Sequence, residues 1–313
     1  MKDKIYYWAS DSSKNSGEGI LAKIFLENLL KSNKNFKLIN LNTVEKSKNN
    51  LAGKYLMPYY GVLKIWKYYL QNKKVCYINY LPLWNFLIFL SLPPNTILGP
   101  ITGTIIKRKF NLFLNFFNKV SIFIISFRFK KILLATNFFL KHFKSKKVFY
   151  NFILSDFEKS KSVNKKKFDF VIYNRQYATK GNIFTSKIIK ILSSKNLKIA
   201  TIGDKFNDKK VHNFGYIKRN TAQKIISKSR FAISSEENLY SFFTQDCLSK
   251  NLIIFYNKEF KKYCIYFKNQ LVPIDYQNEK KTIKIILKHF SKKNISKKKY
   301  YNKFNFKEYF ATD

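Results

Sequence analysis

The sequence predicts an α/β protein with two doubly wound parallel-sheet domains. Short apolar runs of strand length alternate along the chain with segments whose apolar residues recur three and four positions apart. A length of 313 residues and a hydrophobic content of 46% allow two separate cores, because one domain takes ~100 to 200 residues. Around residues 155 to 167 apolar residues are scarce and charges are dense, which is typical of a linker. We therefore predict an N-terminal domain over residues 1–160 and a C-terminal domain over residues 161–313.

The N-terminal domain is predicted to alternate strand and helix from its first apolar run, KIYYWA. The run ILAKIFLENLLK is predicted to be a helix because its apolar residues fall on one face of a 3.6-residue turn. Since strands and crossover helices follow one another, helices should cover both faces of a parallel sheet. The predicted strands are 4–9, 36–41, 75–79, 96–101 and 132–136. The predicted helices are 20–31, 61–70, 84–92 and 110–127.

The C-terminal domain repeats this alternation after the linker. Its predicted strands are 168–173, 198–202, 211–215 (a strand or a loop), 231–234 and 252–256. Its predicted helices are 184–193, 222–229 and 242–249, and residues 291–313 are expected to form a helix or tail. Doubly wound sheets bind ligands at the carboxyl ends of their strands, so we expect the function to lie in a cleft where two such edges face one another.

The formal charge of +42 requires an explanation. Nucleic acid is one candidate partner, because each phosphate that a lysine neutralises releases counterions. However, Lys, Asn, Ile, Phe and Tyr all have codons rich in A and T, so drift of the genome towards A and T would produce the same composition. Arginine, which suits bidentate phosphate recognition best, occurs at only five positions. An anionic membrane surface or an anionic small ligand fits the charge equally well, and a basic nucleic-acid-binding protein remains the alternative.

The most apolar region, residues 75–106, has no charged side chain and is long enough to cross a bilayer. Prolines at 82, 93, 94 and 100 divide it into short pieces, which favours buried strands and turns. The following helix, 110–127, contains Lys119 and is interpreted as amphipathic, with one side facing a membrane. The N-terminus lacks the apolar run of a signal peptide and the three cysteines are scattered. We expect a cytoplasmic protein, peripheral on the inner face of the cell membrane, without a metal site or a cofactor.

Basic residues and a glycine follow the first strand of the C-terminal domain. Arg175 and Lys180 lie in the loop after that strand, and Gly181 allows the backbone to start a helix close to a ligand. Two cations beside a helix N-terminus suit a pyrophosphate. A solvated loop in a lysine-rich chain is the simpler alternative for Lys180, and it is less attractive for the scarce Arg175.

Further glycines and acidic residues follow other predicted strands. Gly203 and Asp204 form a tight turn of the kind that lines nucleotide pockets, and Gly215 precedes the next helix. In the N-terminal domain, Gly17 and Gly19 separate the first strand from the first helix. The run SSEENLY, residues 234–240, places two of the rare acidic residues after a strand, where a carboxylate could hold sugar hydroxyls or simply complement a helix N-terminus.

Taken in order, these motifs resemble the donor-binding half of the retaining GT-B glycosyltransferases, the family 4 group of bacterial sugar transferases. Arg175 and Lys180 keep the five-residue spacing of that family's Arg and Lys. Ser234 and Glu237 match a Ser followed three residues later by a Glu. The family has a second Glu eight residues further on, where this chain has Gln245.

The resemblance implies two Rossmann-like domains and the transfer of a sugar from a nucleotide-sugar donor to a lipid-linked or surface-polysaccharide acceptor, with retention and without a metal. It gives Glu237 the catalytic contact with the donor sugar, and it places the diphosphate on the basic loop. It implies that Gln245, or the neighbouring Asp246, binds the ribose of the donor. The residues expected to bind the donor are Arg175, Lys180, Gly181, Gly203, Asp204, Gly215, Asn238, Leu239, Gln245, Gly17 and Gly19. An inverting, fucosyltransferase-like GT-B enzyme is the alternative within this fold, suggested by the pairs at 237–238 and 244–245.

Overall fold

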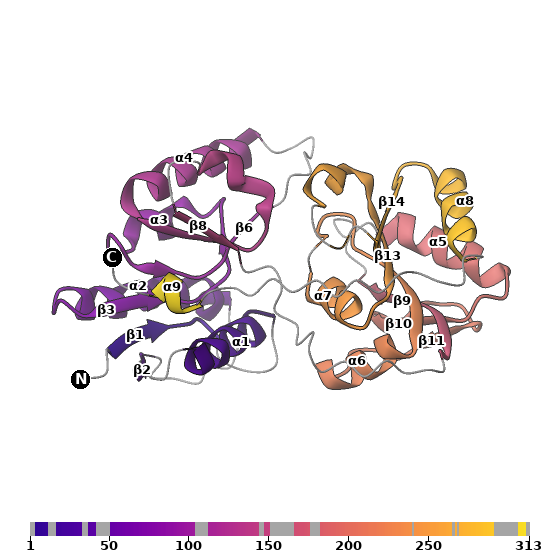
Figure 1. Cartoon of the computed structure of the whole chain (residues 1–313), viewed down its shortest axis with the longest axis horizontal. Coiled ribbons are helices and arrows are strands. Elements are labelled where there is room, and N and C mark those ends of the chain that lie inside the picture. Colours follow the sequence, from indigo (N-terminus) through magenta and orange to yellow (C-terminus); the bar gives the residue numbers. More distant parts are fainter. Residues whose placement is uncertain are drawn as a thin grey trace. The chain divides into compact units, whose positions relative to one another are not determined.

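A computed structural model of the chain confirms the predicted fold class, two α/β units built on parallel sheets (Figure 1). The units are Met1–Leu154 together with Lys303–Asp313, and Ser155–Asn302. The structure describes residues 4–11, 17–32, 37–41, 51–103, 112–143, 147–150, 166–175, 182–239, 241–264, 267, 269–290 and 306–310.

The N-terminal unit contains two four-stranded sheets in which every described pair of strands is parallel. The first sheet has the order β2-β1-β3-β5, with β1 (Lys4–Trp8), β2 (Lys37–Asn40), β3 (Lys74–Tyr77) and β5 (Ile97–Leu98). The second has the order β4-β6-β7-β8, with β4 (Leu81–Pro82), β6 (Ile101–Thr102), β7 (Lys131–Leu134) and β8 (Lys147–Tyr150).

The chain passes from one sheet to the other at Gly99 and Pro100, so the single strand predicted over 96–101 is wrong. The N–H of Gly99 donates to the Tyr77 carbonyl at 2.7 Å, whereas the Pro100 carbonyl accepts from the N–H of Leu81 at 3.0 Å. A Cβ on Gly99 would lie 2.3 Å from the carbonyl oxygen of Asn79, so only glycine fits there. Each half of the predicted strand therefore pairs with a different neighbour.

Helices of this unit pack against these sheets. They are α1 (Gly17–Ser32), α2 (Leu51–Tyr69), α3 (Phe86–Ser91), α4 (Leu112–Arg128) and the 3₁₀ helix η1 (Asn137–His142). α2 begins ten residues before the predicted start and runs through Pro58 without ending. Among the helices that the structure describes, none has the length and apolar character needed to span a membrane.

The short helix α9 (Phe306–Phe310) belongs to the N-terminal unit, although the sequence places it as a tail of the second domain. Tyr309 and Phe310 are fully buried in the core formed by β1, α1, β3 and β7. The Tyr309 hydroxyl donates to the Leu98 carbonyl at 2.8 Å. Glu308 forms an ion pair with Lys147 of β8 at 2.8 Å. The segment is therefore part of the first unit's structure.

The C-terminal unit has one six-stranded parallel sheet of order β11-β10-β9-β12-β13-β14. Its strands are β9 (Phe168–Asn174), β10 (Ile199–Gly203), β11 (Val211–Asn213), β12 (Ser229–Ile233), β13 (Ile253–Asn257) and β14 (Leu271–Ile274). Its helices are α5 (Asn182–Ser194), α6 (Arg219–Ser227), α7 (Phe242–Ser249), α8 (Glu279–Phe290) and the 3₁₀ helix η4 (Lys258–Tyr263).

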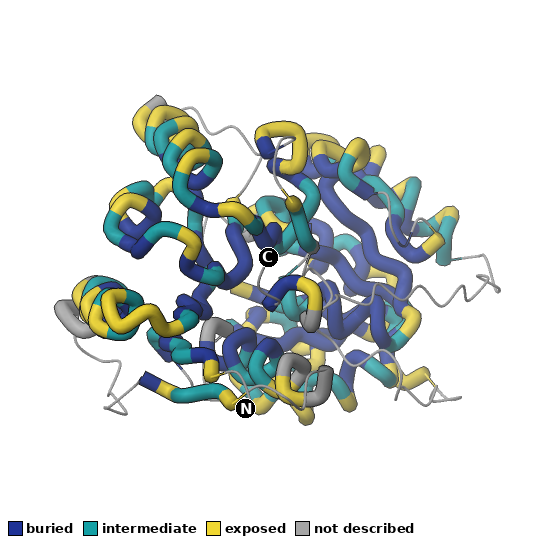
Figure 2. The backbone as a smooth tube through the Cα atoms, turned by 60° about the vertical axis from the view of Figure 1, so that its left-hand side comes forward, coloured by how far each residue is buried: buried dark blue, intermediate teal, exposed yellow. Residues whose placement is uncertain are grey.

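The core of this unit follows the central strands, which are dark blue in Figure 2. Phe170 of β9, Phe231 of β12 and Phe255 of β13 pack ring to ring on one side of the sheet, with centroids 5.3 to 6.2 Å apart. In chain order the strands lie 3-2-1-4-5-6, so the direction of winding reverses between β9 and β12. Doubly wound folds bind ligands at the carboxyl ends of the strands that flank such a reversal.

Candidate functional site

Most of the residues predicted for donor binding follow strands at the carboxyl edge of the six-stranded sheet. Arg175 follows β9, Gly203 ends β10, and Ser234 follows β12. β9 and β12 flank the reversal of winding. The topology therefore brings the loop that begins at Arg175 and the loop 234–239 to neighbouring strands.

The turn after β10 is fixed by close backbone contacts. Gly203 has φ +101°, and a Cβ there would lie 2.3 Å from the carbonyl oxygen of Asn174. Its N–H donates to the Gly215 carbonyl at 2.9 Å, and the N–H of Asp204 donates to the Asn174 carbonyl at 2.9 Å. The buried Asn174 amide returns a hydrogen bond to the Asp204 carbonyl at 2.9 Å. Only glycine fits at 203, because the turn packs directly against the backbone at the end of β9.

Aromatic rings and one cation surround that turn. The exposed Arg175 guanidinium lies 5.0 Å from the centre of the Tyr173 ring and donates to its hydroxyl at 3.1 Å. Tyr173 in turn stacks on Phe243 of α7. The Tyr216 hydroxyl donates to the Asp204 carboxylate at 2.5 Å, and this hydrogen bond raises the pKa of Tyr216 to about 12. At neutral pH Tyr216 is therefore a phenol, and the edge presents a cation, a carboxylate and aromatic rings.

Four of the predicted residues need separate mention. Lys180 and Gly181 lie outside the described residues. Gly17 is the first residue of α1, and Gly19 is a buried position in its first turn. These two glycines belong to the N-terminal unit, at the helix start that follows β1.

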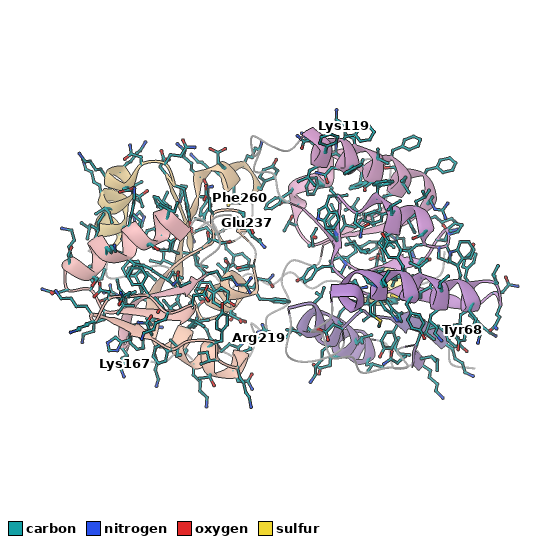
Figure 3. The ribbon with its side chains drawn as sticks, turned by 180° about the vertical axis from the view of Figure 1, so that it is seen from behind. Tyr68, Lys119, Lys167, Arg219, Glu237 and Phe260 are labelled. Carbon is teal, nitrogen blue, oxygen red and sulfur yellow. The ribbon has the colours of Figure 1, made fainter. Side chains whose placement is uncertain are left out.

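The loop after β12 carries Glu237 and is held from several sides. The buried Tyr276 hydroxyl donates to the Ser234 carbonyl, and the Asn257 amide donates to the Glu236 carbonyl at 3.2 Å. Within the loop, the Ser235 hydroxyl donates to the Asn238 carbonyl at 3.2 Å. Leu239 is fully buried, Asn238 is exposed and Glu237 is half-buried. This fixed loop presents the Glu237 carboxylate at the strand end where the sequence predicts it (Figure 3).

Helix α7 begins directly after that loop and carries Gln245 and Asp246. Ser241 caps the helix by accepting from the N–H of Thr244 at 3.2 Å. Both Gln245 and Asp246 are buried. Gln245 lies in the first turn of α7, the helix that follows the loop of Glu237.

Asp246 is engaged by two side chains of α6. Arg219 donates to its two carboxylate oxygens at 2.7 and 3.0 Å, and Gln223 donates at 2.9 Å. This geometry favours a structural role for Asp246. Sequence reasoning missed Arg219, which is labelled in Figure 3, as the partner of Asp246. The only signal in the sequence was that Arg219 is one of five arginines.

The carboxyl edge of the first N-terminal sheet has its own polar group. Beyond β1, the backbone N–H and hydroxyl of Ser10 donate to the side-chain oxygen of Asn79 at 2.8 and 2.9 Å. Asp11 next to it is a buried carboxylate. Sequence reasoning missed these residues, although Asp11 and Asn79 each follow an apolar strand. Within the described part of the chain, no group of three or more His, Cys, Asp or Glu side chains is arranged to hold a metal ion.

Comparisons with known proteins establish the fold. No family model and no curated protein sequence matches the chain. Among solved structures, a putative UDP-N-acetylglucosamine 2-epimerase from Listeria monocytogenes is similar with a TM-score of 0.59 and 10% identity, over 94% of this chain and 89% of the other. WaaG, a glycosyltransferase involved in lipopolysaccharide biosynthesis, is similar with a TM-score of 0.58 and 12% identity, over 92% and 90%.

A third similar structure is the UDP-GlcNAc 2-epimerase of Methanocaldococcus jannaschii, solved with UDP-GlcNAc and UDP, with a TM-score of 0.53 and 13% identity over 95% of both chains. At these identities the likeness shows the fold alone. The chain has the GT-B fold, with two Rossmann-like domains.

Proposed function

We propose that this GT-B chain is a glycosyltransferase that moves a sugar from a nucleotide-sugar donor to a lipid-linked or surface-polysaccharide acceptor of the cell envelope. The observation that carries the proposal is the position of Arg175 and Glu237 in the loops that follow the two strands flanking the reversal of winding. The similar solved structures, which include enzymes of UDP-sugars and of lipopolysaccharide biosynthesis, support the proposal.

In this proposal the donor diphosphate lies over the end of β9. Arg175, Lys180, the backbone of Gly181 and the N-terminus of α5 compensate its charge, so that neither a metal nor a cofactor is required. The nucleoside lies along the turn formed by Gly203, Asp204 and Gly215. Gln245 holds the ribose.

The sugar then lies over the loop after β12. Glu237 is the catalytic carboxylate that contacts it, and the backbone of Asn238 and Leu239 contributes further hydrogen bonds. During transfer the bond from the anomeric carbon to the diphosphate oxygen breaks, a bond from that carbon to the acceptor oxygen forms, and the acceptor's hydroxyl proton passes to the leaving diphosphate. The basic loop stabilises the negative charge that develops on the leaving diphosphate. The product keeps the configuration of the donor.

An inverting reaction is the second candidate, favoured by one observation in the N-terminal unit. Asp11 is a buried carboxylate just beyond β1, next to the hydrogen-bonded Ser10 and Asn79. A carboxylate of this kind can accept the proton of an attacking acceptor hydroxyl. NMR of the anomeric proton of the product separates the two outcomes. If the product is inverted and Asp11→Asn abolishes turnover, the retaining proposal is wrong.

The first experiment is saturation-transfer NMR of UDP-, GDP-, ADP- and CMP-linked sugars with the full chain. We expect one donor to give a signal that falls at least about tenfold in Arg175→Ala, which corresponds to the loss of a charged hydrogen bond. Arg230→Ala is the matched control, because Arg230 also packs on aromatic rings but lies near the amino end of β12. Its donor signal should match the wild type.

Three results would redirect the proposal. Equal donor binding by both arginine variants would refute the site. Absence of any donor signal together with salt-sensitive binding of single-stranded RNA would favour a nucleic-acid-binding protein. Conversion of the donor sugar into an epimer without an acceptor would favour an epimerase.

A further inference from the structure

Helix α4 exposes a row of phenylalanine rings. Phe113, Phe116, Phe123 and Phe127 are exposed, with Phe123 and Phe127 at 73% and 84%. Their intervals of three, seven and four residues place them on one face of the helix. The other face packs on the N-terminal unit, where the buried Ser121 donates a hydrogen bond to the Leu83 carbonyl. The row is therefore directed away from the core of the unit.

Two neighbouring helices continue this apolar surface. α2 packs against α3, and α3 packs against α4. On α2 the exposed apolar side chains recur at intervals of four and three residues, again on one face, and α3 exposes two leucines. These residues are Leu56, Tyr60 and Leu63 of α2, Leu70 directly after its end, and Leu87 and Leu90 of α3. We call these and the four phenylalanines of α4 the α2–α4 surface. A water-exposed surface rarely concentrates so many large apolar side chains without a partner.

Charge identifies the chemistry of that partner. Between Lys46 and Ser155 the sequence has no Asp or Glu, but it has 18 Lys or Arg, and α2, α3 and α4 all lie in this stretch. Lys119 lies between the phenylalanines of α4 and is exposed (Figure 3). On α2 the ammonium of Lys64 lies 5.2 Å from the centre of the Tyr60 ring. The α2–α4 surface thus has lysines beside its aromatic rings, and α2, α3 and α4 contain no acidic residue.

We propose that the α2–α4 surface binds to an anionic lipid bilayer. The rings and leucines would enter the boundary between headgroups and acyl chains, while the lysines contact lipid phosphates. Apolar burial and cationic attraction are both required for stable binding of this kind, and this surface provides both. A single-stranded nucleic acid would contact the lysines and stack its bases on the rings, but it would leave the leucines of α2 and α3 in water. The inference deepens the proposed function, on which it rests for the lipid-linked acceptor.

The test is flotation of the full chain with lipid vesicles. We expect binding to phosphatidylcholine vesicles that contain about 30% phosphatidylglycerol to be at least about tenfold tighter than to phosphatidylcholine alone at about 0.1 M salt. The variant Phe123→Ser/Phe127→Ser should lose at least about tenfold of that binding, because two apolar anchors are removed. Ile183→Ser on α5 is the matched control, since Ile183 is 69% exposed and lies in the other unit. It should bind as the wild type does.

Any of four outcomes would overturn the proposal. These are no flotation of the wild type, equal flotation with neutral vesicles, equal flotation of the double variant, or a wild-type dimer without vesicle binding that the double variant converts to a monomer. The last result would assign the α2–α4 surface to contact between two copies of the chain. Circular dichroism of the double variant checks its fold, and exposed positions should tolerate serine. Donor binding is measured on the same samples and should not change, so failure of the membrane inference can be distinguished from failure of the donor site.

Discussion

The ion pair between Arg219 and Asp246 gives a sharp test of how the donor edge is held together. Its side chains are 23% and 6% exposed, and Gln223 adds a third hydrogen bond. Arg219→Ala removes both charged hydrogen bonds and leaves a buried carboxylate with the weaker amide donor. Removing one partner of a buried pair costs ~3 to 5 kcal/mol. Because Gln223 stays, we expect about 3 kcal/mol of lost stability in the C-terminal unit.

Two further variants calibrate that value. Asp246→Asn keeps one acceptor oxygen, and the arginine that loses its charged partner is partly solvated. We therefore expect the stability to fall by about 1 to 2 kcal/mol. Glu279→Gln breaks the ion pair of Glu279 with Lys187, in which the two side chains are 36% and 55% exposed, respectively. This change should lower the stability by at most about 1 kcal/mol. The order of the three losses tests whether burial determines the strength of the ion pair.

Urea unfolding can assign the loss to one unit, because all three tryptophans, at positions 8, 66 and 84, lie in the N-terminal unit. Circular dichroism follows both units, whereas tryptophan fluorescence follows the first. With a slope of ~2 kcal/mol per M, the loss of about 3 kcal/mol moves the circular-dichroism midpoint of the C-terminal unit by about 1.5 M. The tryptophan midpoint should not move. Equal shifts for Arg219→Ala and Glu279→Gln, or an equal shift of the tryptophan signal, would refute the reasoning.

Three other predictions use the same assays. Gly203→Ala should cost about 1 to 3 kcal/mol and weaken donor binding in NMR, because φ +101° is strained for alanine and its Cβ would meet the Asn174 carbonyl; unchanged stability would show that the turn can relax. Tyr309→Phe should lower the tryptophan-detected stability by about 1 to 2 kcal/mol, because a buried carbonyl of β5 loses its donor. The hydrogen bond from Lys258 lowers the pKa of Asp275, so its stabilisation is present above the unfolded pKa and is lost as pH falls through the folded value. Asp275→Asn should therefore flatten the acid side of the stability profile, measured as urea midpoints from about pH 7 to about pH 3; an unchanged slope would contradict this.

The sequence predicts the central strands well because their burial is continuous. β9, β10 and β13 are buried along most of their length, so each appears as an apolar run. The edge strand β14 was missed because Pro273 interrupts a four-residue run, and an edge tolerates a proline that an interior strand does not. The first half of α2 was missed for a related reason. Pro58 and the glycines around it are typical helix breakers, yet the helix continues through them.

Some residues of the candidate site could be predicted from the sequence and others could not. The loops of Arg175 and Glu237 could be located because a strand end is visible in the sequence. The pairing of Arg219 with Asp246 could not be predicted, since it depends on how α6 packs against α7 across 27 residues of chain. The meeting of Ser10 with Asn79 depends in the same way on the parallel pairing of β1 with β3. Contacts between elements need the tertiary structure, whereas the ends of elements do not.

The return of α9 to the N-terminal unit reverses the order in which the two units can be completed during synthesis. Tyr309 and Phe310 fill the core around β1 and α1, but the ribosome makes them after the whole of the second unit. At ~5 to 20 residues per second, the first unit waits roughly 8 to 30 s with an open core while the second unit emerges and folds. During that interval the apolar side chains that Tyr309 and Phe310 later cover are accessible to chaperones. The unit that begins the chain is thus the last to close.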